Sequence, residues 1–85
     1  MDIDRAKEST RLLEMVLAGE IDPAAALKQW PDIDSEQDDL IEASWHDLSH
    51  YANDDDIRSK DPEYEKQQKQ LLADKANKIK KKYSL

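Results

Sequence analysis

The stretch SEQDDLIEASWHDLSHYA, residues 35–52, carries apolar and small side chains at the spacing of an α-helix. The side chains expected on its inner face are Leu40, Ile41, Ser44, Trp45, Leu48, Tyr51 and Ala52. Asp34 or Ser35 is expected to cap this helix, and Asp34 with Gln37 has the spacing of a capping box. The pattern predicts an amphipathic helix that ends near residue 52 and turns one face toward a core.

Two more helices are expected before this stretch. The first is predicted over residues 4–18, and Gly19, the single glycine of the chain, follows where a left-handed residue commonly ends a helix. Asp22 can accept hydrogen bonds from the first turn of a second, short helix over residues 23–30, with Pro23 at its first position. Pro31 disfavours helical geometry at the residue before it, so this helix should end there.

The last helix is expected over residues 62–82, where Asp61 and Pro62 repeat the arrangement that opens the second helix. Ile57, in the segment before it, is expected to anchor that segment in the core. No alternating run of β-branched residues indicates a strand. The sequence therefore predicts an all-α fold, a small single-domain bundle of about four helices with no sheet, or alternatively three long helices with a linking turn. The side chains expected to be buried are Leu13, Val16, Leu17, Leu27, Leu40, Ile41, Trp45, Leu48, Leu72 and Ile79.

Charge is distributed unevenly along the 85 residues, whose formal net charge is -7. Residues 1–61 form an acidic body with 17 acidic and 6 basic residues, whereas the lysine-rich residues 62–85 carry 3 and 7. An acidic body repels phosphate, so nucleic-acid binding is not expected. The chain has no cysteine and no apolar segment long enough to span a membrane, which indicates a cytoplasmic protein.

The stretch YANDDDIRSKDPEYE, residues 51–65, holds more acid than helix caps require. A calcium-binding loop is not indicated, because a register that begins at Asp54 places Arg58 at the fifth position and Ser59 where the loop needs glycine. Solvation of the surface explains part of the surplus. The other explanation is a contact surface for a basic partner. The residues predicted to form that surface are Asp38, Asp39, Glu42, Asp54, Asp55 and Asp56.

Two histidines, His46 and His50, are four residues apart, as in the H-E-x-x-H zinc motif. Asp47 would replace the glutamate of that motif, no further His or Cys can complete the site, and the helical spacing turns both histidines away from the core. We therefore expect no catalytic, cofactor or metal site. Chance binding of a metal ion by the two histidines stays open.

These features favour a small non-catalytic module for protein–protein interaction or regulation, monomeric or weakly dimeric, that binds a basic protein through its acidic face. The alternative is self-association, in which the lysine-rich last helix of one chain packs on the acidic body of another. In size, sign of charge and expected fold the chain is similar to the immunity proteins that neutralise basic nuclease toxins, and such an inhibitor is a further alternative. This likeness covers no sequence motif and transfers no binding residue. Trp30, if exposed, would be an anchor for a partner.

Overall fold

The computed structural model describes residues 2–85, except for the side chain of Asp2. Its elements are helix α1 (Asp2–Leu17), α2 (Pro23–Gln29), the short 3-10 helix η1 (Ile33–Ser35), α3 (Asp39–Asn53), α4 (Asp55–Lys60) and α5 (Pro62–Tyr83). No strand occurs in this part of the chain, and 82% of it is helical. The predicted all-α bundle is confirmed.

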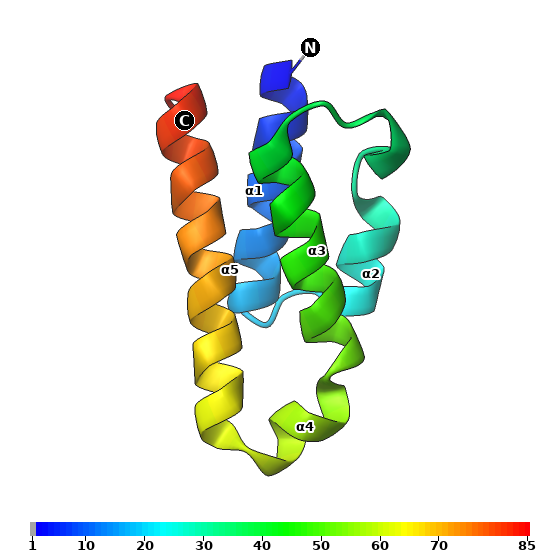
Figure 1. The fold of residues 1–85 in the computed structure, drawn as a ribbon, viewed down its shortest axis with the longest axis vertical. Coiled ribbons are helices and arrows are strands. Elements are labelled where there is room, and N and C mark those ends of the chain that lie inside the picture. Colours follow the sequence, from blue (N-terminus) through cyan, green and yellow to red (C-terminus); the bar gives the residue numbers. More distant parts are fainter. Residues whose placement is uncertain (1) are drawn as a thin grey trace.

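The helices form an elongated bundle that measures 40 × 23 × 22 Å (Figure 1). Helices α1 and α3 run in one direction and α2 and α5 in the other. The long helix α5 packs against α1, α3 and α4, while α2 packs against α3 and α1. Within residues 2–85, no helix is long and apolar enough to cross a bilayer.

Three of the expected helix ends have the predicted chemistry. Gly19 adopts a φ of 75°, the left-handed conformation in which glycine avoids the strain that a Cβ would bring. The carboxylate of Asp22 accepts a hydrogen bond from the backbone of Ala24 at 3.1 Å. Asp61 accepts from the amides of Glu63 and Tyr64, both at 3.1 Å. The Asp-Pro pair therefore opens α5 as it opens α2.

The start of α3 differs from the prediction, because Asp38 caps the helix and neither Asp34 nor Ser35 does. Asp32 instead caps η1, accepting from the backbone of Asp34 and the hydroxyl of Ser35. The proposed capping box of Asp34 and Gln37 is wrong. Five acidic residues between positions 32 and 39 offer similar caps, and contacts with α5, distant in sequence, distinguish Asp38 from the others.

Helix α4 was not expected, and the prediction for Ile57 is wrong, since this side chain is 49% exposed. Arg58 takes the inward position next to it, with a side chain only 10% exposed. Its Nε donates to the Tyr51 carbonyl at 2.8 Å, and its guanidinium lies 3.8 Å from the centre of the Tyr51 ring. The arginine covers the Tyr51 ring and supplies a donor to a carbonyl in the last turn of α3. Ile57 therefore lies on the outer side of α4.

Within residues 2–85 the core contains twelve buried apolar side chains, eleven from α1, α2, α3 and α5 and the twelfth from Trp30, which directly follows α2. Six of the expected core residues are buried, namely Leu13, Val16, Ile41, Leu48, Leu72 and Ile79. The other four, Leu17, Leu27, Leu40 and Trp45, are partly buried and pack against this core. Trp30 is 7% exposed, so it belongs to the core and offers no surface anchor.

Candidate functional site

The Asp38 carboxylate joins the beginning of α3 to the end of α5. One oxygen accepts from the amides of Leu40 and Ile41 at 2.8 and 3.3 Å. The other accepts from Lys82 Nζ at 2.8 Å and from the Tyr83 hydroxyl. The side chain is 8% exposed. We call Asp38, Lys82 and Tyr83 the clasp.

The clasp alters the acidity of Asp38. Burial alone raises the pKa of its carboxyl group, because charge is costly to remove from water. The hydrogen bonds from Lys82 and Tyr83 and from the Leu40 and Ile41 amides favour the charged form and outweigh burial, so the pKa falls from 3.8 to about 2. The fold thus holds Asp38 ionised, and its charge is directed into the molecule.

Other lysines of α5 also pair with acids on neighbouring helices. Lys75 Nζ lies 2.9 Å from Asp47 Oδ2 on α3, and Lys80 Nζ lies 2.6 Å from Glu14 Oε1 on α1. Together with Lys82, these lysines attach the second half of α5 to the acidic helices beside it. Much of the positive charge that the sequence places after residue 61 is therefore matched inside the chain.

The C-terminal end of α3 uses its aspartates differently. The Tyr64 hydroxyl donates to Asp54 at 2.6 Å, and this hydrogen bond to a carboxylate raises the pKa of Tyr64. Asp55 Oδ1 lies 3.4 Å from Arg58 Nη2 and is otherwise exposed. Asp56 is exposed, and its carboxylate has no hydrogen bond or ion pair within residues 2–85. Three consecutive acids therefore have three different environments.

Two acidic residues of α3 point to solvent. Asp39 is exposed and its carboxylate has no partner in the described chain. Glu42, with a side chain 49% exposed, lies beside His46 at 3.7 Å. Residues 29–57 contain no Lys or Arg at all, so no cation from this segment offsets these charges. We call Asp39, Glu42 and Asp56 the outer acids.

The structure thus divides the six predicted contact residues into two groups of three. Asp38, Asp54 and Asp55 contact a lysine, a tyrosine and an arginine respectively, and Asp38 is nearly buried, whereas Asp55 is 80% exposed. The outer acids are accessible and contact no lysine, arginine or tyrosine within residues 2–85. The helical periodicity could have separated inner from outer positions on α3. It could not have revealed the clasp, whose partners lie 44 and 45 residues away from Asp38.

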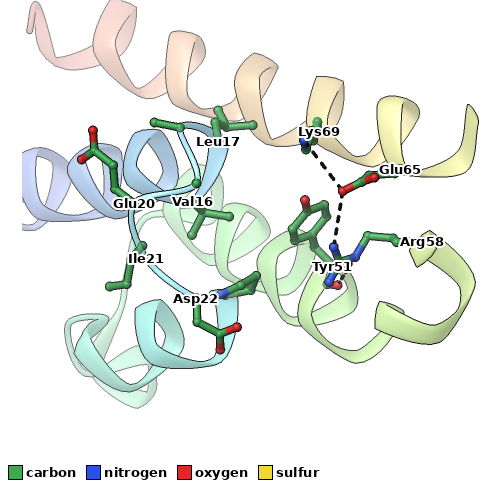
Figure 2. A pocket seen from close by; sticks show the side chains of 12 residues that line it. Val16, Leu17, Glu20, Ile21, Asp22, Tyr51, Arg58, Glu65 and Lys69 are labelled. Carbon is green, nitrogen blue, oxygen red and sulfur yellow. Dashed lines mark hydrogen bonds and ion pairs between the residues drawn. The ribbon is translucent and has the colours of Figure 1, made fainter. Parts of the chain in front are cut away.

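A cleft of about 530 Å³ lies between the turn after α1, the end of α3, α4 and the first turns of α5 (Figure 2). Glu65 extends between Arg58 and Lys69, with 3.8 Å from its Oε1 to Arg58 Nη1 and to Lys69 Nζ. Glu20 and Asp22 add negative charge to the lining. Cations and anions alternate here, so the cleft presents no field of a single sign and no arrangement of nucleophile and base.

Within residues 2–85, no group of three or more His, Asp or Glu side chains converges on a position that could hold a metal ion. His46 and His50 are exposed on α3, as the helical spacing predicted. The predicted contact residues that stay accessible therefore form a negatively charged surface. Comparison of the chain with protein-family models, with curated proteins and with solved structures finds no match.

Proposed function

We propose that the protein is a small non-catalytic binding module that recognises a basic protein through the outer acids Asp39, Glu42 and Asp56. The observation that supports this is the contrast with Lys75, Lys80 and Lys82 of α5, which pair with other acids and leave these three without a lysine or arginine partner. An acidic side chain that neither caps a helix nor pairs with a lysine increases the charge repulsion within the folded protein. A basic partner would relieve that repulsion.

Charge complementarity of this kind acts mainly on association. It steers a basic partner toward the surface and raises the association rate, and added salt weakens the effect. An inhibitor of a basic protein could use this surface to speed its association with that protein, and an immunity-type inhibitor would be one such case. The absence of cysteine is compatible with action in the cytoplasm.

Self-association through the basic helix has less support. It would require the lysines of α5 to pair with acids of a second chain, whereas Lys75, Lys80 and Lys82 already pair within their own. We therefore propose a monomer. Sedimentation at several salt concentrations tests this, because a dimer held by such pairs would dissociate as salt increases.

The test of the binding surface compares two variants of equal net charge. The first, Asp39→Asn/Glu42→Gln/Asp56→Asn, neutralises the outer acids. The matched control, Asp4→Asn/Glu63→Gln/Asp74→Asn, removes three exposed carboxylates from α1 and α5. Wild-type protein and both variants are immobilised, and a cell extract is passed over each. The proteins that bind are then eluted with increasing salt.

We expect at least one basic protein to be retained by the wild type and by the control but lost from the outer-acid variant at lower salt. Equal loss from both variants would mean that net charge alone matters. If every protein retained by the control is retained equally by the outer-acid variant, the proposal is wrong. The free energy of unfolding of the outer-acid variant should stay within about 0.5 kcal/mol of the wild-type value, because substitutions of exposed residues rarely cost more.

A further inference from the structure

The outer face of α3 carries both histidines of the chain, His46 and His50. They are separated by four residues in a continuous helix, which places their side chains one above the other about 6 Å apart along the axis. The Cα–Cβ bonds of a helix tilt toward its N-terminus, so the side chain of His50 leaves the backbone in the direction of the turn that carries His46. Two imidazoles in this relation can bind one metal ion together.

The surroundings leave both rings available. The His46 side chain is 57% exposed, and its Nε2 lies 3.7 Å from Glu42 Oε1, beyond the length of a hydrogen bond. The side chain of His50 is exposed and has no hydrogen bond or ion pair within residues 2–85. No lysine or arginine occurs on α3 to repel a cation, while Glu42 adds a negative charge one turn away.

We propose that His46 and His50 form a surface chelate for a divalent transition-metal ion such as Cu²⁺, Ni²⁺ or Zn²⁺. These ions accept imidazole ligands, whereas Ca²⁺ and Mg²⁺ require oxygen. With two protein ligands the ion keeps open positions for water or for a group of another molecule. A bound dication would also place positive charge beside Asp39 and Glu42. The chelate itself does not depend on the proposed partner.

The matched control is His50→Gln/Asn53→His, which keeps two histidines on the exposed face of α3. The second histidine then lies seven residues from His46, or about 10 Å along the axis, too far for both rings to bind one ion. His46→Gln/His50→Gln measures binding by the rest of the chain. Each protein is titrated with Cu²⁺, Ni²⁺ and Zn²⁺ by calorimetry at pH 7.5 and pH 5.5.

Tryptophan fluorescence gives a second readout. The Trp45 and His46 rings meet edge to face, with centroids 5.2 Å apart, so Cu²⁺ on His46 should quench Trp45. Trp30, buried at the end of α2, is the other tryptophan and supplies the signal that remains.

We expect the wild type to bind one ion, about tenfold or more tightly than either variant, because the second imidazole is held at high effective concentration beside the first. Ca²⁺ should not compete, and binding should weaken at pH 5.5 because a metal ion needs the neutral ring. Equal affinity in the wild type and in the spaced control would overturn the proposal, since each histidine would then act alone. Binding that persists in His46→Gln/His50→Gln at wild-type strength would also overturn it.

Discussion

The two ends of α3 are both acidic, but their carboxylates serve different purposes. At the N-terminal end the buried Asp38 accepts two backbone hydrogen bonds and is held by Lys82 and Tyr83. At the C-terminal end Asp55 and Asp56 are exposed, and a cleft of about 530 Å³ opens beside α4. Helix α5 reaches both ends, but its lysine-rich part lies at the first end only.

This difference shows that the environment of an aspartate, more than its place in an acidic run, decides what it does. Asp38 and Asp39 are neighbours in sequence, yet one is 8% exposed and the other points to solvent. A carboxylate with four donors stabilises the fold. An exposed carboxylate without a partner adds little to stability and is free to contact another molecule.

The largest expected difference in stability is between a substitution in the packed middle of α3 and one on the exposed side of α4. Leu48→Ala should destabilise the protein by about 2 to 5 kcal/mol, because Leu48 is fully buried and its loss leaves a cavity. Ile57→Ala should cost less than about 1 kcal/mol, because this side chain is half exposed. Urea unfolding measures both. Similar costs for the two substitutions would show that α4 packs more closely than described.

A second comparison removes one carboxylate from each end. Asp38→Ala should cost about 2 to 3 kcal/mol, because it removes a helix cap and leaves the donors of the clasp without their acceptor. Asp56→Ala should cost less than about 0.5 kcal/mol, since an exposed residue without a partner contributes little. The midpoints of urea unfolding at pH 7 provide the comparison. If Asp56→Ala were the more damaging, the assignment of the two ends would be reversed.

The acidity of Asp38 predicts a difference in pH dependence. Its pKa is lowered from 3.8 to about 2 in the folded state, so the unfolded chain binds a proton more readily. The stabilisation is complete above the unfolded pKa and is lost as the pH falls from about 4 toward 2, for a total of about 2 kcal/mol. Asp38→Asn lacks this contribution.

We therefore expect the difference in unfolding free energy between wild type and Asp38→Asn to shrink as the pH is lowered through that range. Other carboxylates titrate in both proteins and cancel in the difference. Unfolding curves measured between pH 2 and pH 6 test it. A difference that stays constant across this range would mean that the Asp38 carboxyl is not held ionised by the fold.

The sequence predicts the fold class and most helix ends because the signals for them are local. Apolar periodicity marks α1, α3 and α5, and an aspartate followed by proline opens α2 and α5. Helix α4 has only six residues, which is too short for a helical period to show in the sequence. Ile57 points outward because Arg58, the next residue, packs against Tyr51 on the inner side. Contacts between distant residues decide such short segments.

The candidate site was predictable only in part for the same reason. Periodicity places His46 and His50 on the outer face of α3, and the structure confirms their exposure. Periodicity cannot distinguish Asp38 from the other acidic residues before α3, because a helix cap requires only a suitable residue type at a suitable position. Asp38 is selected by Lys82 and Tyr83, whose approach follows from the packing of α5 on α3.

The most direct test of this division is a pair of double-mutant cycles on neighbouring aspartates. One cycle combines Asp38→Asn with Lys82→Met, and the other combines Asp39→Asn with Lys82→Met, with unfolding free energy as the readout at pH 7. We expect a coupling of about 1 kcal/mol or more for Asp38 and Lys82, and less than about 0.3 kcal/mol for Asp39 and Lys82. Equal couplings in the two cycles would contradict the account, because the acids of α3 would then not be divided into an inner and an outer set.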